Sequence, residues 1–434
     1  MPYLLNLIYL LLLLLASPWL IYRALRQGKY REGFAEKLLG RVPARAGNRP
    51  CVWFHAVSVG EVNLLAPLVN EIRRDRPLWE CVVSTTTMTG YAVARKKYPA
   101  LTVFYCPLDF SWAVRAAMRR VRPELLVLAE LELWPNLVRA AGVYGARVAI
   151  VNGRLSERSH RGYRRLRALV GPILRRVDVL AAQNDEYARR FLDLSARTDA
   201  VRVTGSIKYD GAQTDRRNPA TARLRELAGI GDDDLVFLAG STQEGEEAAA
   251  LAAYLALRDE FPKLRLIIVP RHPERFAAVA QLLDRSSVAW RCRGRLETEG
   301  SHGDARILLV DTVGELGAWW GTSAIAFVGG SLGSRGGQNM IEPAAYGAAV
   351  SFGPNTRNFR DIVAALLAHE AAVVVRDDRE LTAFVRRCLA DPEYARALGG
   401  AARRFVAGQL GATARTLELL APLVDTPPSH KAAA

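Results

Sequence analysis

The chain has 434 residues, half of them hydrophobic, and carries a formal net charge of +15. This length exceeds what one hydrophobic core usually holds, so we expect two domains. The five cysteines are scattered, odd in number and without a C-x-x-C spacing, which argues against a disulfide framework or a zinc site. The six histidines are equally scattered and suggest no metal site, and we expect no cofactor. No nucleic-acid motif is present, so the charge favours an anionic membrane or anionic substrates as partners.

Residues 4–22 form an apolar run with two frankly polar interruptions, Asn6 and Ser17. About 20 such residues can span a bilayer. A cleaved signal peptide carries its positive charge before the apolar core. Here the basic residues follow the core, at Arg23, Arg26, Lys29 and Arg31. We therefore expect an uncleaved membrane anchor over residues 1–28, with the following domains on the cytoplasmic side. Pro18 could break the helix, so a full span and a position within one leaflet both stay open.

Short apolar runs then alternate with helical patterns, which predicts an α/β fold with parallel sheets covered by helices on both faces. The runs lie at 51–57, 80–84, 101–105, 124–129, 147–151, 178–182 and 200–204, and again at 235–239, 264–269, 306–310, 324–328, 348–352 and 371–375. Residues 209–220 lack periodicity and are predicted to be a linker. We expect one Rossmann-like domain over 29–210, a second over 211–410, and a final helix and tail over 411–434. Two such domains would face a cleft, with ligands at the carboxyl ends of the strands.

A glycine-rich loop follows the apolar run 323–328 and leads into a predicted helix start near Pro343. Residues 327–342 are Phe-Val-Gly-Gly-Ser-Leu-Gly-Ser-Arg-Gly-Gly-Gln-Asn-Met-Ile-Glu. Glycines let the backbone turn tightly and approach a bound group, and the free N–H groups of a helix start suit an anion. We expect a phosphorylated small molecule to bind here. A plain tight turn, or a capping box formed by Asn339 and Glu342, would explain the same residues.

Glu61 follows the first predicted strand and Gly60. Ser58 and Glu61 have the spacing of a capping box, but a helix that begins there would hold Pro67 in its interior, at a cost of roughly 3 kcal/mol. We therefore expect the helix to begin nearer Asn63 and to leave Glu61 in a loop. A carboxylate in that loop could take a proton from an attacking hydroxyl.

Other polar residues also follow predicted strands of the first half. Candidate contacts to an acceptor or an anion are Ser58, Gly60, Glu130, Arg154 and Lys208. These residues would surround Glu61 at the carboxyl edge of the sheet.

The second half has strand-end residues that suit a nucleotide. Arg271 is a good phosphate donor, and the backbone of residues 313–315 could meet a base or sugar edge. Glu342 could accept hydrogen bonds from ribose hydroxyls. A nucleotide in the second half and a second substrate beside Glu61 in the first is the layout of a two-domain glycosyltransferase.

Several segments together resemble the 3-deoxy-D-manno-octulosonic acid (Kdo) transferase family. They are His55-Ala-Val-Ser-Val-Gly-Glu61-Val, Leu131-Glu-Leu-Trp-Pro-Asn136, Asn152-Gly-Arg-Leu-Ser156, Gly205-Ser-Ile-Lys208, Val269-Pro-Arg-His-Pro-Glu-Arg275, and Phe327-Val-Gly-Gly-Ser331 with Gly336-Gly-Gln-Asn339. The resemblance covers the chain in order, from the anchor to about residue 365.

This resemblance implies a GT-B fold, a CMP-Kdo donor, and a lipid A precursor (lipid IVA) as acceptor at the cytoplasmic face of the inner membrane. By the same resemblance, Glu61 matches the catalytic base. The residues that match CMP-binding segments are Pro270, Arg271, Val313, Gly314, Glu315, Asn339, Met340, Ile341 and Glu342. The family's usual methionine before Gly314 is Val313 here, and Gln243 stands where the family often has histidine, which leaves a side-chain role for Gln243 open.

Two other functions compete with Kdo transfer. A nucleotide-sugar epimerase could share the two-domain layout, but its substrate and product are soluble, which the anchor argues against. A non-catalytic protein that binds anionic membrane or nucleic acid would rest on charge alone and would show a steep salt dependence.

Overall fold

The computed structural model describes residues 2–27, 32–300 and 305–425. It divides into two compact units, unit 1 (residues 1–211 and 410–434) and unit 2 (residues 212–409). The predicted basic residues Lys29 and Arg31 and the polar tail 426–434 lie outside the described residues.

Unit 1 contains a parallel sheet of seven strands in the order β3-β2-β1-β4-β5-β6-β7. The strands are β1 (Cys51–His55), β2 (Glu80–Thr85), β3 (Thr102–Tyr105), β4 (Leu125–Ala129), β5 (Arg147–Gly153), β6 (Val179–Ala182) and β7 (Val201–Val203). The helices are α1 (Pro2–Gln27), α2 (Phe34–Leu39), α3 (Val59–Leu64), α4 (Ala66–Asp75), α5 (Met88–Lys97), α6 (Ser111–Val121), α7 (Pro135–Val143), α8 (Glu157–Arg165), α9 (Arg167–Leu174), α10 (Asp185–Asp193) and α20 (Ala412–Asp425).

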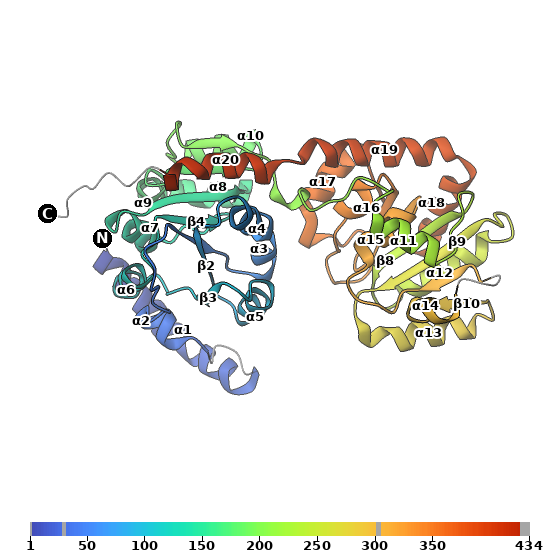
Figure 1. The fold of residues 1–434 in the computed structure, drawn as a ribbon, viewed down its shortest axis with the longest axis horizontal. Helices are drawn as coiled ribbons and strands as arrows, with labels where there is room; N and C mark the ends of the chain where they lie inside the picture. Colours follow the sequence, from blue (N-terminus) through green and yellow to red (C-terminus); the bar gives the residue numbers. More distant parts are fainter. Residues whose placement is uncertain (1, 28–31, 301–304, 426–434) are drawn as a thin grey trace. The chain divides into compact units, whose positions relative to one another are not determined.

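Helices cover both faces of this sheet (Figure 1). Residues of α6, α7, α9 and α10 pack on one face around Trp53 and Leu126. Residues of α3, α4, α5 and α20 pack on the other, around Phe54 and Val127. Because both faces are buried, the central strands β1 and β4 are apolar nearly throughout instead of alternating, as expected for a parallel sheet.

Unit 2 contains a second parallel sheet of seven strands, in the order β10-β11-β9-β8-β12-β13-β14. The strands are β8 (Leu235–Thr242), β9 (Leu264–Pro270), β10 (Trp290–Cys292), β11 (Ile307–Leu309), β12 (Ile325–Val328), β13 (Ala349–Phe352) and β14 (Val373–Val374). The helices are α11 (Pro219–Leu227), α12 (Glu246–Leu257), α13 (Phe276–Arg285), α14 (Leu296–Glu299), α15 (Leu316–Trp319), α16 (Ile341–Ala345), α17 (Arg360–Ala368), α18 (Asp378–Ala390) and α19 (Pro392–Gln409).

The predicted α/β fold with two parallel sheets is therefore confirmed. The strand β10 was not predicted, because it is a three-residue edge strand with Arg291 at its centre and forms no apolar run. The segment predicted as a linker is partly ordered: Arg216 Nε donates to the Tyr346 carbonyl at 2.7 Å, and Asn218 caps α11. The final helix α20 belongs to unit 1, where Asp210 accepts from the Gly411 N–H at 2.7 Å.

Candidate active site

Glu61 lies in the first turn of α3, directly after β1. Its carboxylate accepts hydrogen bonds from the Val57 N–H at 2.7 Å and from the Ser58 hydroxyl at 2.9 Å. The Ser58 oxygen in turn accepts from the Glu61 N–H at 3.4 Å. The capping arrangement is thus present, and it holds the carboxylate in one position at the carboxyl edge of the sheet.

The expectation that this helix begins near Asn63 is wrong. The helix α3 begins at Val59 and ends at Leu64, and a second helix, α4, begins at Ala66. Pro67 therefore lies in the first turn of α4. A backbone N–H at this position would have no acceptor within the helix, so the absence of one in proline costs no hydrogen bond. The objection raised by Pro67 disappears because the chain forms two short helices in place of one long helix.

Three carboxylates and one ammonium group gather around this point. Burial raises the pKa of Glu61, the hydrogen bonds from Val57 and Ser58 oppose the rise, and the charges of Glu130 and Lys208 act in opposite directions. Glu130 follows β4 in a left-handed conformation, with φ at 55°, and its Oε1 lies 3.0 Å from Lys208 Nζ. The structure therefore brings together Glu61, Glu130 and Lys208.

Glu132 belongs to the same group. Burial raises the pKa of Glu132 to about 7, the charges of Glu61 and Glu130 add to the rise, and a hydrogen bond from Trp134 opposes it. A carboxyl group that titrates near neutrality beside Glu61 can adjust the charge that Glu61 experiences.

The structure also places Gly60 and Arg154 directly after strands of the same sheet. Gly60 is exposed in the first turn of α3, where an added Cβ would meet only ordinary contacts. Arg154 is half-buried and directly follows β5, whose neighbour in the sheet is β4. Arg154 therefore lies at the same edge of the sheet as Glu130.

Asn152 connects the two loops that carry Arg154 and Lys208. It is fully buried and left-handed, with φ at 54°, a conformation that asparagine tolerates better than most residues. Its Oδ1 accepts from the Ser206 hydroxyl at 3.2 Å and from the Ile207 N–H at 3.1 Å. Asn152 thereby fixes the segment that presents Lys208. The local pattern Asn-Gly-Arg is typical of a turn and does not indicate this contact.

We expect Glu132→Gln to flatten the pH dependence of stability. The stabilisation that goes with a protonated Glu132 is complete below the ordinary pKa of 4.5 and is lost as the pH rises through about 7. Melting temperatures measured from about pH 5 to 8 should fall for the wild type more than for Glu132→Gln. The exposed Glu157→Gln is the control, and parallel curves for wild type and Glu132→Gln would contradict the assignment.

In unit 2, the glycine-rich loop uses its N–H groups inside the protein. The carboxylate of Glu246, at the start of α12 and 1% exposed, accepts from the N–H groups of Gly330 at 2.6 Å, Ser331 at 2.9 Å and Leu332 at 2.9 Å. It also accepts from the Gln243 N–H at 2.8 Å. The expectation that this part of the loop binds a phosphate is therefore corrected, because an internal carboxylate already occupies these donors.

The end of the same loop is arranged differently. Asn339 Oδ1 accepts from the Ile341 N–H at 3.1 Å, and Asn339 Nδ2 donates to Glu342 Oε1 at 3.0 Å. Burial raises the pKa of Glu342, and the Asn339 amide and the Trp320 indole oppose the rise. Met340 and Ile341 are buried, so their side chains belong to the core and only Asn339 and Glu342 present polar side-chain atoms here.

Arg271 directly follows β9, which ends at Pro270. Its backbone N–H donates to the Thr242 carbonyl at 3.0 Å, while its guanidinium is exposed and makes no ion pair with a carboxylate of the described residues. Four residues along the chain, Arg275 makes a bidentate contact with buried Glu247, at 3.0 Å for both pairs of atoms. The second arginine thus anchors the segment, and Arg271 has its charge available.

In the segment Val313–Glu315, the first two residues are exposed and Glu315 is half-buried. Burial alone would raise the pKa of Glu315, but hydrogen bonds from Arg293 and Thr312 hold it below its usual value. Arg293 contacts both carboxylate oxygens, at 2.9 and 2.7 Å. Val313 is 77% exposed and Gly314 is left-handed, with φ at 97°. Arg293 was not predicted, because nothing in its local sequence signals a partner 22 residues away.

Comparison with known proteins identifies the family. The family profile described as 3-deoxy-D-manno-octulosonic-acid transferase (kdotransferase) matches residues 31–211. The 3-deoxy-D-manno-octulosonic acid transferase of Haemophilus influenzae is 32% identical over 428 residues, covering 96% of this chain and 98% of the relative. The Bordetella pertussis transferase of the same name is 36% identical over 418 residues, covering 93% and 94%.

A solved structure shows the same fold at low identity. The UDP-GlcNAc 2-epimerase from Neisseria meningitidis bound to UDP-GlcNAc superposes with a TM-score of 0.56 at 14% identity, over 86% of this chain and all of that one. This likeness concerns the GT-B type of fold alone, whereas the sequence relationship extends along nearly the whole chain. The chain belongs to the 3-deoxy-D-manno-octulosonic acid transferase family and is a glycosyltransferase of lipopolysaccharide biosynthesis.

Proposed function

We propose that the protein transfers Kdo from CMP-Kdo to lipid IVA at the cytoplasmic face of the inner membrane, with Glu61 as the general base. The observation that carries this proposal is the position of Glu61: a half-buried carboxylate with a raised pKa, fixed by two hydrogen bonds at a strand end. A raised pKa brings a carboxylate closer to the value at which it accepts protons efficiently near neutral pH.

The donor nucleotide is assigned to unit 2. The exposed guanidinium of Arg271 suits the phosphate of CMP, and the exposed residues Val313 and Gly314 suit the base or sugar edge. Asn339 and Glu342 supply polar atoms for the ribose hydroxyls. Glu315 is held by Arg293 and would support this site without contacting the ligand through its carboxylate.

A lipid acceptor is supported by an apolar groove in unit 1. The groove has a volume of about 360 Å³. It is lined by Leu5 of α1, Leu133, Tyr163 and Ile173, and by the exposed arginines Arg139 and Arg176. These apolar side chains suit an acyl chain, and the guanidinium groups suit the phosphate of a lipid. Leu133 lies between Glu132 and Trp134, so the groove adjoins the loop of the carboxylate cluster.

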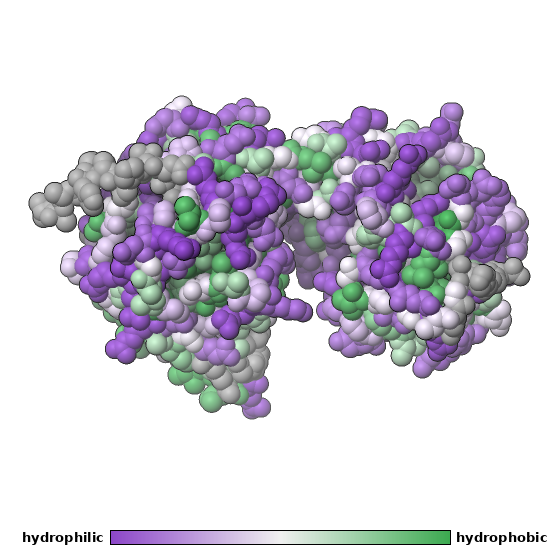
Figure 2. All heavy atoms as spheres, in the orientation of Figure 1, coloured by the Kyte–Doolittle hydropathy of each residue, from purple (hydrophilic) through white to green (hydrophobic). Residues whose placement is uncertain are grey.

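The membrane is assigned to the apolar surface of α1. Hydrophobic atoms gather in Figure 2 at the part of unit 1 where Figure 1 places this helix. Among the residues described, one helix is long and apolar enough to cross a membrane: α1, through its stretch Pro2–Trp19. The family relationship and the basic net charge add support for an anchor.

The proposed reaction is a single displacement. The acceptor hydroxyl oxygen bonds to the anomeric carbon of Kdo while the bond from that carbon to the phosphate oxygen of CMP breaks. The hydroxyl proton passes to Glu61, and the bonding electron pair leaves with CMP, whose charge Arg271 stabilises. The charge of Lys208 favours the ionised form of Glu61, and the charge of Glu130 raises the basicity of Glu61.

Incubation of the purified protein with CMP-Kdo and lipid IVA tests the proposal. Release of CMP together with a lipid product heavier by Kdo units is expected. In a parallel incubation with a UDP-sugar and no lipid, conversion of that sugar would favour an epimerase. Binding to anionic vesicles without either reaction would favour the non-catalytic alternative.

We expect Arg271→Ala to weaken CMP binding by about 1.5–3 kcal/mol, because a charge-assisted hydrogen bond is lost. Isothermal titration of CMP into the full chain measures this change. Arg285→Ala removes another exposed arginine of unit 2 and is the control. Equal affinity of the Arg271→Ala and Arg285→Ala variants for CMP would remove Arg271 from the donor site.

A further inference from the structure

The apolar helix α1 is attached to unit 1 by polar contacts near its N-terminal end. Asn6 Nδ2 donates to the Ser111 hydroxyl at 2.7 Å, and Asn6 Oδ1 accepts from the Ser111 N–H at 2.9 Å. Ser111 is the first residue of α6, so its N–H has no partner within that helix. Asn6 is only 6% exposed and accepts a hydrogen bond from the otherwise free N–H at the start of α6.

Tyr9 makes a second contact one turn further along α1. Its hydroxyl donates to Asp109 Oδ2 at 3.1 Å, and its ring meets Phe110 edge-on, at 6.1 Å between centroids. Asp109 is 3% exposed and also accepts from the N–H groups of Asn136 at 2.9 Å and Leu137 at 2.8 Å, in the first turn of α7. One carboxylate thus connects α1 to the start of α7.

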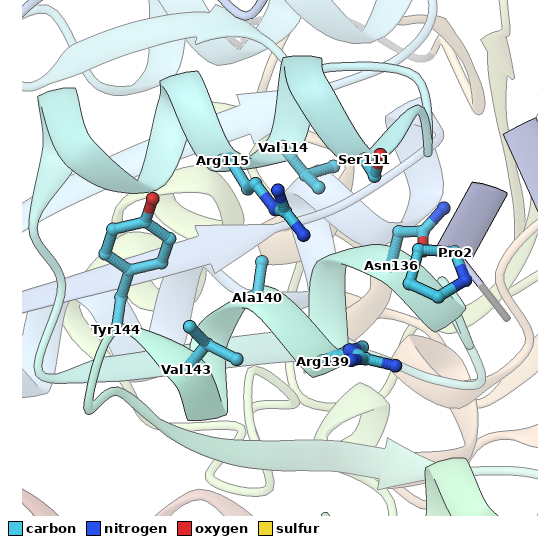
Figure 3. Close-up of a pocket in the computed structure, with 9 residues that line it drawn as sticks. All are labelled: Pro2, Ser111, Val114, Arg115, Asn136, Arg139, Ala140, Val143 and Tyr144. Carbon is cyan, nitrogen blue, oxygen red and sulfur yellow. The ribbon is translucent and has the colours of Figure 1, made fainter. Parts of the chain in front are cut away.

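The first turn of α1 lies directly against these helices. Figure 3 shows Pro2 beside Asn136, with Ser111 nearby on α6. Pro2 and Asn6 are buried, and Leu5 and Tyr9 are half-buried, so the spacing of these residues defines one helical face that packs on the domain.

The opposite face of α1 is apolar and exposed along its length. Tyr3, Leu7, Leu11, Leu14, Leu15 and Leu25 are each more than half exposed, up to 78% for Leu15. Near the C-terminal end, the Arg23 guanidinium lies over the Trp19 ring at 4.6 Å, a pairing suited to the boundary between lipid and water. A continuous apolar face of this size is typical of contact with a membrane.

A full span is incompatible with these contacts. Asn6 and Arg23 are separated by 17 residues, which is about 26 Å along a helix and close to the thickness of a bilayer core. If α1 crossed the membrane with Arg23 on the cytoplasmic side, Asn6 and Tyr9 would lie near the other surface. Ser111 and Asp109 belong to the same folded unit as Glu61, and that unit cannot lie on both sides.

We propose that α1 does not cross the membrane but lies within one leaflet, docked on unit 1 through Asn6 and Tyr9, with its opposite face in the lipid. The partner of this surface is the leaflet that faces unit 1. The proposal does not require the assigned chemistry, since an enzyme that failed to transfer Kdo could still be docked in this way.

A cysteine pair in the full chain tests the docking in native membranes. In the variant Asn6→Cys with Ser111→Cys, mild oxidation is expected to form a disulfide. Cys292, the one native cysteine not buried in the structure as described, is replaced by serine to remove a competing thiol. The pair Leu7→Cys with Ser111→Cys is the control, because Leu7 is on the exposed face, and it should not cross-link. Absence of the disulfide in the first pair overturns the proposal.

A labelling experiment tests the same point without changing the contacts. Tyr3→Cys places a thiol on the exposed face of the first turn, with Asn6 and Tyr9 intact. In intact spheroplasts of a Gram-negative host, a membrane-impermeant maleimide is expected to leave this thiol unlabelled. Labelling from outside would show that the N-terminal end crosses the membrane and would overturn the proposal, whether or not the protein transfers Kdo.

Discussion

Glu61→Gln should fold normally, bind CMP as the wild type does, and lose nearly all transfer. A positioned base contributes a factor of roughly 10² to 10⁴ to the rate, and an amide cannot accept the proton of the acceptor hydroxyl. Glutamine keeps one oxygen that can accept from the Val57 N–H, so the start of α3 should persist. Initial rates of CMP release, with CMP affinity and melting temperature measured on the same preparation, test this expectation.

The conservative variant and the pH profile sharpen the test. Glu61→Asp should also transfer poorly, because its shorter side chain cannot reach both the hydroxyl and the hydrogen bonds from Val57 and Ser58. Burial raises the pKa of Glu61, so the wild-type rate should fall, as the pH is lowered, at a higher pH than an ordinary glutamate would give. That acidic limb should be absent from the residual activity of Glu61→Gln.

A purely structural role for Glu61 predicts the opposite result. Stability would fall by about 1 kcal/mol, as for other losses of a helix cap, and turnover would be largely kept. Ser58→Ala is the matched variant, because it removes the capping hydroxyl and leaves the carboxylate in place. Substantial transfer by a well-folded Glu61→Gln would move the search for the base to Glu130 and Glu132.

The sequence could predict the strands because a buried parallel sheet produces continuous apolar runs, and it could predict the family because the motifs lie at strand ends in a fixed order. It could not predict that α3 and α4 are separate helices. The residues around Pro67 are compatible both with one helix that begins near Asn63 and with two consecutive helices. In the structure, Val62 and Leu64 of α3 and Leu68 of α4 all pack in the same hydrophobic core, which the two-helix arrangement allows.

Contacts between distant residues were equally hidden. Asn6 looked like an interruption of an apolar run, and its partner Ser111 is 105 residues away. Glu246 lies in the first turn of α12, where an acidic residue is favourable on local grounds alone, and the loop it binds lies more than 80 residues later. Local propensity carries no signal for either pair, because both partners would be acceptable at their positions without the other.

Glu246→Gln should destabilise unit 2 and weaken CMP binding together. The wild-type carboxylate accepts from four backbone N–H groups, those of Gln243, Gly330, Ser331 and Leu332. Glutamine would present an NH₂ donor toward some of these donors, leaving buried N–H groups unsatisfied and losing the charge that strengthens the others. Each carboxylate oxygen accepts from two of these groups, so two are left unsatisfied. At one to three kcal/mol for each, the penalty is about 2–6 kcal/mol. The neighbouring Ser331 also donates to the Val328 carbonyl and accepts from the Gly353 N–H, so the disturbance should spread to β13.

Thermal unfolding of the full chain with and without CMP measures both effects. The transition of unit 2 should shift to lower temperature, and the stabilisation that CMP gives to the wild type should shrink, because the same loop continues into Asn339 and Glu342. Glu244→Gln is the matched control: Glu244 is exposed two residues before Glu246, so its substitution makes the same change of charge without touching the loop. If Glu246→Gln and Glu244→Gln melt alike and bind CMP alike, the carboxylate of Glu246 does not organise the glycine-rich loop, and the N–H groups of residues 330–332 become available again as a phosphate site.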